Sequence, residues 1–166
     1  MKTSEQKIVP FDIKRSVEKA QKLQGDESNS ILTSNGKEYT WNGSMERLHF
    51  VREGIPYQSI EVISQRLSRP VKSVLNWVGM PQTTYNKKKG ERSLIDSRDS
   101  ELILLISELI DFGIEVFNNE NDKFERWMKK PNLSLEGNSP ESLLDTITGI
   151  SEVKNCLNKL EFGNFA

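Results

Sequence analysis

The segment LILLISELIDFGIEVF, residues 102–117, is the strongest indication of the fold class of this 166-residue chain. Its polar side chains are confined to four positions: Ser107, Glu108, Asp111 and Glu115. In a helix these positions form one narrow stripe, so the rest of the helix surface is apolar and must be buried on several sides. The sequence therefore predicts an all-α protein built around this helix. Periodicity leaves two equal alternatives: the helix is the centre of the domain, or it also supplies a homodimer seam.

Shorter helices are expected on both sides of this stretch. Asp96 is a suitable N-cap for the long helix, and Asp99 favours its first turn. Upstream, capping residues, prolines and glycines predict helices at about 44–52, 56–67, 70–78 and 82–89. Downstream, Asn121 or Asp122 would cap a helix that Pro131 ends, a short helix follows Ser139-Pro140, and Gly149 separates it from a last helix.

One small β-element is expected near the N-terminus. Ser34-Asn35-Gly36-Lys37 lies between two short apolar runs and is typical of a type I′ hairpin turn, although a solvent-exposed loop is the alternative. A two-stranded ribbon is marginally stable alone, so this one would have to pack on the helices. Residues 19–30 are polar with few apolar anchors, which is typical of a flexible segment.

The charges are unevenly distributed although the net charge is only −1. Residues 1–65 are balanced, and residues 66–92 carry seven basic side chains against Glu91 alone. Residues 93–166 carry seven basic and fourteen acidic side chains. A basic block beside an acidic half predicts one surface for a polyanion and a second surface for another partner.

The basic block coincides with the spacing of a helix-turn-helix motif. Residues 71–78 would form the first helix, Gly79 the turn, and residues 82–89 the second helix, which enters the DNA major groove in this motif. Gln82 and Asn86 suit contacts with adenine, and Thr83 and Thr84 can reach bases or phosphates. Phosphate contacts are expected from Lys87, Lys88, Lys89 and Arg92. The alternative is a solvated basic helix in an ordinary bundle; the coincidence favours DNA binding.

Signatures of enzymes are missing from the sequence. It contains no glycine-rich phosphate loop, no HExxH metal motif and no GxSxG nucleophile elbow. His49 is interpreted as a residue at the edge of the core and Cys156 as a small buried hydrophobe. One cysteine excludes an intramolecular disulfide and a Cys-rich zinc site. We therefore expect no catalysis, no metal and no cofactor.

Signals for export or membrane insertion are also missing. The first residues lack the apolar region of a secretory signal, and the longest apolar run, residues 102–106, is far too short to span a membrane. The expected location is the cytoplasm, with no membrane partner.

Several sequence landmarks occur together from residue 53 onwards. They are Glu53-Gly54-Ile55-Pro56, Gly79-Met80-Pro81-Gln82-Thr83-Thr84-Tyr85, the series Trp127, Pro131-Asn132, Leu135, Gly137, Pro140, Leu143-Leu144-Asp145-Thr146, Gly149 and Val153, and the ending Glu161-Phe162-Gly163 to Ala166. In these landmarks the chain resembles the Xre/MbcA/ParS-type antitoxins, the DNA-binding partners of RES-domain toxins in bacterial type II toxin–antitoxin systems. The resemblance covers roughly two-thirds of the chain and leaves out residues 1–45.

The resemblance implies a homodimeric antitoxin that represses its own operon by binding operator DNA and caps a RES toxin, an enzyme that depletes NAD. The toxin-binding domain would be shaped by Trp127, Asn132, Leu135, Gly137 and Pro140, and the tail that blocks the toxin's NAD pocket would be Phe162, Gly163, Asn164, Phe165 and Ala166. An acidic surface and a terminal carboxylate suit a cationic pocket built for a phosphate-bearing cofactor.

Three regions follow from this interpretation. Residues 1–45 form an N-terminal extension, partly flexible or a small hairpin; residues 46–95 form the helix-turn-helix region; and residues 96–166 form the dimerisation and toxin-binding domain with its tail. Many relatives have Arg in the recognition helix where this chain has three Lys, so phosphate anchoring is expected more than base specificity. The alternatives are a stand-alone helix-turn-helix regulator or DNA-organising protein, and a small all-α enzyme for which no residue nominates a mechanism.

Overall fold

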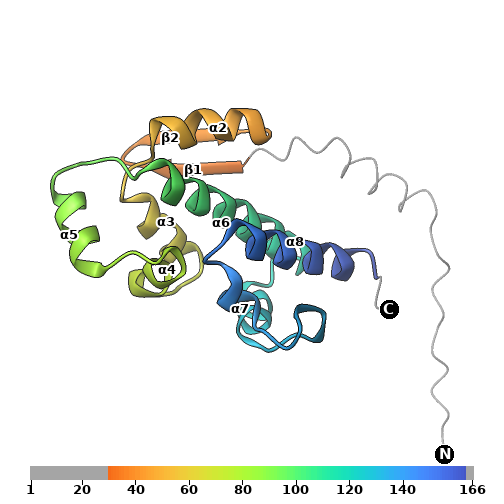
Figure 1. Ribbon diagram of the computed structural model, residues 1–166. Helices are drawn as coiled ribbons and strands as arrows, with labels where there is room; N and C mark the ends of the chain where they lie inside the picture. The colour runs from red at the N-terminus through yellow and green to blue at the C-terminus, as the bar shows by residue number, and fades with distance from the viewer. Residues whose placement is uncertain (1–29, 164–166) are drawn as a thin grey trace, which may run out of the picture.

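A computed structural model describes residues 30–163 of the chain, and these residues fold into helices around one hairpin (Figure 1). The elements in chain order are β1 (Ser30–Ser34), β2 (Lys37–Trp41), α2 (Ser44–Glu53), α3 (Ser59–Arg66), α4 (Val71–Val78), α5 (Gln82–Gly90), α6 (Ser97–Val116), α7 (Asn121–Lys129), the 3₁₀ turns η1 (Leu133–Leu135) and η2 (Pro140–Leu143), and α8 (Ile147–Glu161). The predicted fold class, all-α with one small hairpin, is confirmed. The flexible segment expected at residues 19–30 lies, apart from Ser30, outside the described residues.

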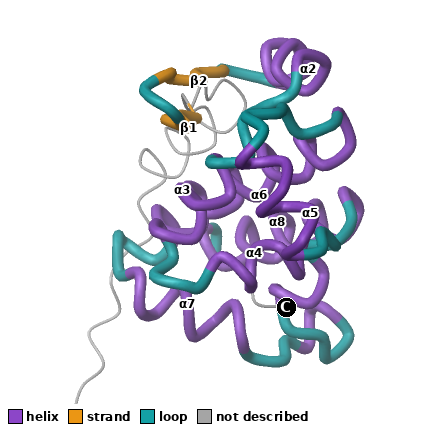
Figure 2. Tube along the Cα trace, turned by 90° about the vertical axis from the view of Figure 1, so that its left-hand side faces the viewer, coloured by secondary structure: helices purple, strands orange, loops and turns teal. Residues whose placement is uncertain are grey.

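Helix α6 lies at the centre of the fold and contacts α2, α3, α4, α7, α8 and β1 (Figures 1 and 2). Ile103, Leu104 and Ile106 are completely buried, and Leu105 and Phe112 are partly buried. Neighbours within one chain therefore cover most of the apolar surface that the sequence showed. Helix α6 therefore lies at the centre of the domain.

The polar stripe of α6 fastens three other elements to it. Glu108 accepts hydrogen bonds from Trp41 Nε1 of β2 at 2.5 Å and from Arg47 Nη1 of α2 at 2.6 Å. Arg66, at the end of α3, donates to Asp111 Oδ1 at 3.0 Å and also to Ser107 Oγ at 2.9 Å. Burial raises the pKa of the Asp111 carboxyl, although the Arg66 guanidinium acts in the opposite direction. The polar stripe predicted from the sequence thus attaches β2, α2 and α3 to α6.

The predicted hairpin is present with the predicted turn. Ser34 pairs with Lys37, and the two central residues, Asn35 and Gly36, have φ values of 53° and 72°, as a type I′ turn requires. One face of the ribbon is buried, with Leu32, Tyr39 and Trp41 at most 3% exposed. The ribbon packs on α2, α3 and α6, and this packing stabilises two strands that would be marginal alone.

The prediction that Gly149 separates the last helix from the preceding segment was wrong. Gly149 lies within the first turn of α8. Thr146 is the N-cap, and its Oγ1 accepts a hydrogen bond from Gly149 N at 3.0 Å. A Cβ at position 149 would lie 1.9 Å from the carbonyl oxygen of Leu143. The glycine is therefore required for the close approach of α8 to η2, a contact that no local pattern reveals.

Smaller differences concern helix ends and one side chain. Gly43, and not Ser44, is the N-cap of α2; Pro56 precedes α3 by three residues and forms a bridge with Leu94. Glu120 is the N-cap of α7, so neither Asn121 nor Asp122 is its cap, and the short helix at 140 is a 3₁₀ turn.

His49 is exposed and its Nε2 lies 3.3 Å from Glu53 Oε1, so the prediction that it lies at the edge of the core was wrong. Cys156 is buried and Asp96 caps α6, as predicted.

Two kinds of feature are absent from residues 30–163. No helix there is long and apolar enough to cross a membrane. No group of His, Cys, Asp or Glu in the same range is arranged to hold a metal ion.

The close approach at Gly149 leads to a prediction on stability. Gly149→Ala should lower the free energy of unfolding by at least about 2 kcal/mol, because the new Cβ collides with backbone and the helix must shift. Gly90, the last residue of α5, has nothing within 4 Å of an added Cβ, so Gly90→Ala should leave stability unchanged or raise it by up to about 1 kcal/mol. Urea unfolding of both variants measures this; equal stabilities would contradict it.

Candidate functional site

The two helices of the predicted helix-turn-helix lie at the predicted positions, joined by a tight turn. Gly79 ends α4 in the left-handed conformation, with φ at 72°, and Met80 N donates to Leu75 O at 2.9 Å. Pro81 then leads directly into α5. The buried side chains Trp77, Val78 and Met80 hold the turn against the core. Helix α5 lies at the end of the molecule opposite the C-terminus of α8 (Figure 1).

The N-terminal half of α5 presents polar side chains to the surface. Gln82, Thr83, Thr84 and Asn86 are all exposed, whereas Tyr85 is 3% exposed and packs inward. Gln82 Nε2 donates to Asn86 Oδ1 at 3.0 Å, so these two amides already form a pair along the exposed face. The structure therefore brings together all four residues that the sequence nominated for base contacts.

The basic residues of this region divide into two groups. Lys89 is tied to α3, because its ammonium group pairs with Glu61 and lies 5.8 Å from the centre of the Tyr85 ring. Lys88 pairs with Glu91 on the next turn at 3.4 Å. Neither Lys87 nor Arg92 takes part in an ion pair within residues 30–163. Lys87 and Arg92 are therefore the more accessible positive charges of the predicted phosphate contacts.

Glu61 of α3 is a residue that sequence reasoning missed. Its carboxylate accepts from Tyr85 Oη at 3.0 Å as well as from Lys89, and so holds α5 against α3. The hydrogen bond from Lys89 lowers the pKa of Glu61, while burial acts against it. Burial and the same carboxylate raise the pKa of Tyr85. An acidic residue 28 positions before Lys89 offers no local signal of this contact.

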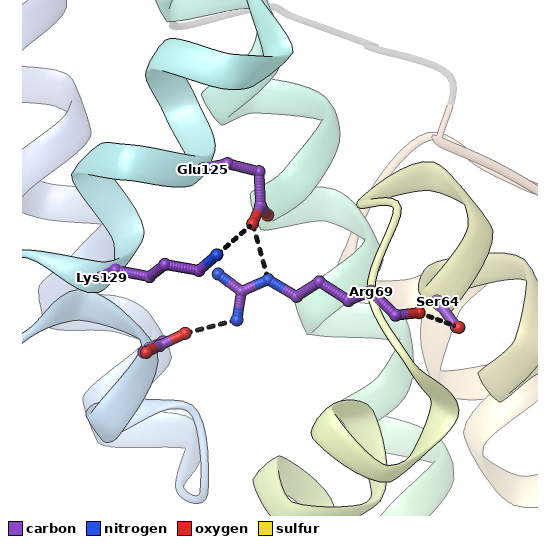
Figure 3. A network of polar contacts seen from close by, with 5 residues as sticks. Ser64, Arg69, Glu125 and Lys129 are labelled. Atoms are coloured by element: carbon purple, nitrogen blue, oxygen red, sulfur yellow. Dashed lines mark hydrogen bonds and ion pairs between the residues drawn. The ribbon is translucent and has the colours of Figure 1, made fainter.

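A second polar network joins the segment before α4 to α7 and η2 (Figure 3). Arg69 precedes Pro70, the N-cap of α4, and its side chain is only 8% exposed. Its Nε donates to Glu125 Oε2 of α7 at 2.7 Å, and its Nη1 pairs with Glu141 of η2. The guanidinium also lies 5.2 Å from the centre of the Trp77 ring. One side chain thus joins α4 to two elements, α7 and η2, that come more than 50 residues later in the chain.

In the Arg69 network the cost of burying the guanidinium is offset by its hydrogen bonds to Glu125 and Glu141. Burial by itself lowers the pKa of Arg69, but the hydrogen bonds to Glu141 and Glu125 outweigh it and the pKa is raised. Within the described residues Arg69 Nη2 and Glu125 Oε1 are buried with no hydrogen-bond partner. Removing one member of a buried ion pair leaves the other charge uncompensated, which is more destabilising than the pair is stabilising.

Arg69→Met should lower the free energy of unfolding by about 3 kcal/mol, because Glu125 and Glu141 would remain without their guanidinium. The triple variant Arg69→Met, Glu125→Gln, Glu141→Gln removes all three charges and should recover part of that loss. Urea unfolding at neutral pH measures both. A single variant with the unfolding midpoint of the original chain would show that the network does not stabilise the fold.

The residues that the resemblance assigned to the toxin-binding domain mostly build its interior. Trp127 is partly buried and stacks on Phe124, with ring centres 6.2 Å apart. Leu135 and Pro140 are buried. Asn132 and Gly137 shape the loop between α7 and η2: Asn132 O accepts from Gly137 N at 2.9 Å, and Gly137 has a φ of 83°. Among the exposed side chains of this loop, Leu133 is a large hydrophobic one, and no local pattern in the sequence predicted its exposure.

The C-terminal tail begins at the surface. Phe162, at the end of α8, is 39% exposed, and Gly163 follows with a φ of 64°. The other three residues of the predicted tail, Asn164, Phe165 and Ala166, lie outside the described residues. More than a third of the Phe162 surface is therefore accessible to a partner.

Comparisons with known proteins agree with the earlier resemblance. Residues 113–163, from the end of α6 to the end of α8, match the family described as the Antitoxin Xre/MbcA/ParS C-terminal toxin-binding domain. An "Antitoxin Xre" of Photorhabdus laumondii is 26% identical over 68% of this chain and 76% of its own length; one of Yersinia enterocolitica is 28% identical over 70% and 78%. A "Prs ADP-ribosylating antitoxin" of a Sphingobium species is 26% identical over 74% and 82%. Each relative is named as an antitoxin, which supports the prediction that this chain is not an enzyme.

Proposed function

Because this chain belongs to the Xre/MbcA/ParS-type antitoxins, we propose that it neutralises a RES-domain toxin that depletes NAD and represses its own operon. The observation that carries the proposal is the match of residues 113–163 to a toxin-binding domain. In the fold, the C-terminal end of that domain lies at the end of the molecule opposite α5 (Figure 1). Two separate surfaces allow one chain to bind a toxin and DNA, both in the cytoplasm.

The toxin contact is proposed to end in the active site of the toxin. Phe162 is accessible at the end of α8, and Gly163 turns the chain there in a left-handed conformation. Residues 162–166 would then enter the pocket that binds NAD. The terminal carboxylate and the acidic balance of residues 93–166 suit a pocket whose basic groups bind the phosphates of that cofactor.

The name of the Sphingobium relative suggests a second kind of toxin. It refers to ADP-ribosylation, a reaction that transfers the ADP-ribose part of NAD to an acceptor. A toxin of that kind also binds NAD, so the same tail would suit it. The two kinds are distinguished by following NAD loss in the absence of an acceptor and the transfer of labelled ADP-ribose to protein.

Deletion of residues 162–166 tests the tail. The purified toxin encoded beside this chain should consume NAD alone and lose this activity when the full chain is added. The shortened chain should still form a complex, since the body of the domain is intact, but should restore most of the NAD consumption. A Met45→Ser variant of the full chain, altered on α2 and outside residues 113–163, serves as the control and should inhibit fully. Full inhibition by the shortened chain would refute the role of the tail.

DNA binding is proposed to use the exposed face of α5. Gln82, Thr83, Thr84 and Asn86 would contact base edges, and Lys87, Lys88 and Arg92 would contact phosphates. Lys89 would position α5 through Glu61, or reach a phosphate only after releasing it. A homodimer would place two copies of α5 in successive major grooves of a palindromic operator. This assigns residues 46–95 to DNA and 96–166 to dimerisation and toxin binding, with 1–45 as an extension.

Lys87→Gln with Lys88→Gln tests the phosphate contacts. Removing two contacts per chain should weaken binding to a duplex from the region upstream of its own gene and to a random duplex alike. The slope of log affinity against log salt should decrease by about 2 per chain. Lys123→Gln with Lys154→Gln removes the same charge at exposed sites on α7 and α8 and should change neither slope nor affinity. Unchanged binding by the α5 variant would refute this surface.

The alternative is a stand-alone helix-turn-helix regulator without a toxin. It predicts DNA binding by α5 but no complex with the neighbouring gene product. Co-expression of the two genes followed by size-exclusion chromatography separates the alternatives, because only an antitoxin elutes with the toxin.

A further inference from the structure

Large apolar side chains on the surface are concentrated in the toxin-binding domain. The exposed ones among the described residues are Met45, Leu94, Leu133, Ile147 and Phe162, of which the last three lie within residues 113–163. Leu133 is the most exposed, at 96%, so almost none of its side chain contacts the rest of the chain. A leucine in that position contributes nothing to the core, and its burial against a partner would be favourable.

The loop that carries Leu133 is closed by its own hydrogen bonds. Asn132 N donates to Asn138 O at 3.0 Å, and Asn132 O accepts from Leu135 N at 3.0 Å as well as from Gly137 N. The Asn132 side chain also accepts from Ser134 N at 2.9 Å. The loop therefore keeps one conformation and does not need a partner to define it.

The same loop is attached firmly to α8. Leu135 is 6% exposed in the core, and η1 packs against α8. Asn132 Nδ2 lies 3.4 Å from Cys156 Sγ, and desolvation of that thiol by burial raises its pKa. Leu133 thus projects from between two anchored residues. Little conformational entropy would be lost when its side chain enters a pocket on another protein, which is a property of effective binding anchors.

We propose that Leu133 is an apolar anchor of the toxin interface, inserted into a small pocket lined by apolar side chains on the toxin. The proposal rests on the proposed toxin binding and extends it to a second point of contact. Asn132 fixes the loop to the C-terminal half of α8, the helix that ends at Phe162. Leu133 would hold the domain on the toxin surface while the tail reaches the active site. It therefore governs affinity, and the tail governs inhibition of NAD consumption.

Leu133→Ser tests the anchor through the dissociation constant of the complex with the purified neighbouring toxin. Losing the burial of one leucine should weaken binding about 10- to 100-fold, mainly through faster dissociation. Leu133→Met keeps an apolar side chain and should bind within about threefold of the original chain. Leu94→Ser and Met45→Ser remove exposed hydrophobic side chains outside residues 113–163 and should not change binding.

The folding of the Leu133→Ser variant is checked independently of its toxin affinity. Because Leu133 is outside the core, Leu133→Ser should keep the original urea unfolding midpoint and the original affinity for DNA. If the folded Leu133→Ser variant bound the toxin as tightly as the original chain, or if Leu94→Ser weakened binding equally, Leu133 would not be an anchor of the interface. Either result would leave the proposed antitoxin function unaffected. Absence of any complex with the unaltered chain would instead refute the proposed toxin binding itself.

Discussion

The burial of α6 on nearly all sides is the constraint on which the rest of the structure depends. A helix with so much apolar surface must be surrounded, and α2, α3, α4, α7, α8 and the hairpin supply that cover. Its polar groups are then brought out of water and require partners, which Trp41, Arg47 and Arg66 provide. Hydrophobic burial sets which elements meet, and the polar contacts set where along the helix each one sits.

The Arg69 network has a comparable importance for the relation between the two proposed surfaces. It ties the segment before α4 to α7 and η2, so α4 and α5 are attached to elements of residues 113–163, the part of the chain that matches the toxin-binding domain. The Arg69 guanidinium, 8% exposed, has both Glu125 and Glu141 as partners, and a displacement that removed them would leave a buried positive charge uncompensated. The fold is therefore expected to hold α5 and the C-terminal end of α8 at opposite ends of one rigid body.

Local signals in the sequence predicted most elements correctly. The turn at Asn35-Gly36, the helix end at Gly79 and the N-cap at Asp96 depend only on the conformation or hydrogen bonding of immediate neighbours. They could therefore be predicted without knowledge of the fold. Gly149 was misinterpreted for the opposite reason. It is required by a carbonyl oxygen of another element, six positions earlier, and a glycine needed for such a contact looks the same in sequence as one that ends a helix.

The fold class, the basic and acidic segments, the residues nominated for base contacts and the resemblance to an antitoxin family could all be predicted before the fold was known. Composition, periodicity and ordered landmarks are properties of the chain alone. How individual side chains are used depends on the folded arrangement. It directs Lys89 to Glu61 while Lys87 remains accessible, and it buries Leu135 while Leu133 stays exposed. Each pair is chemically alike and close in sequence. What separates its members is the direction in which the folded backbone points each side chain, and that direction is set by packing against residues far away in the chain.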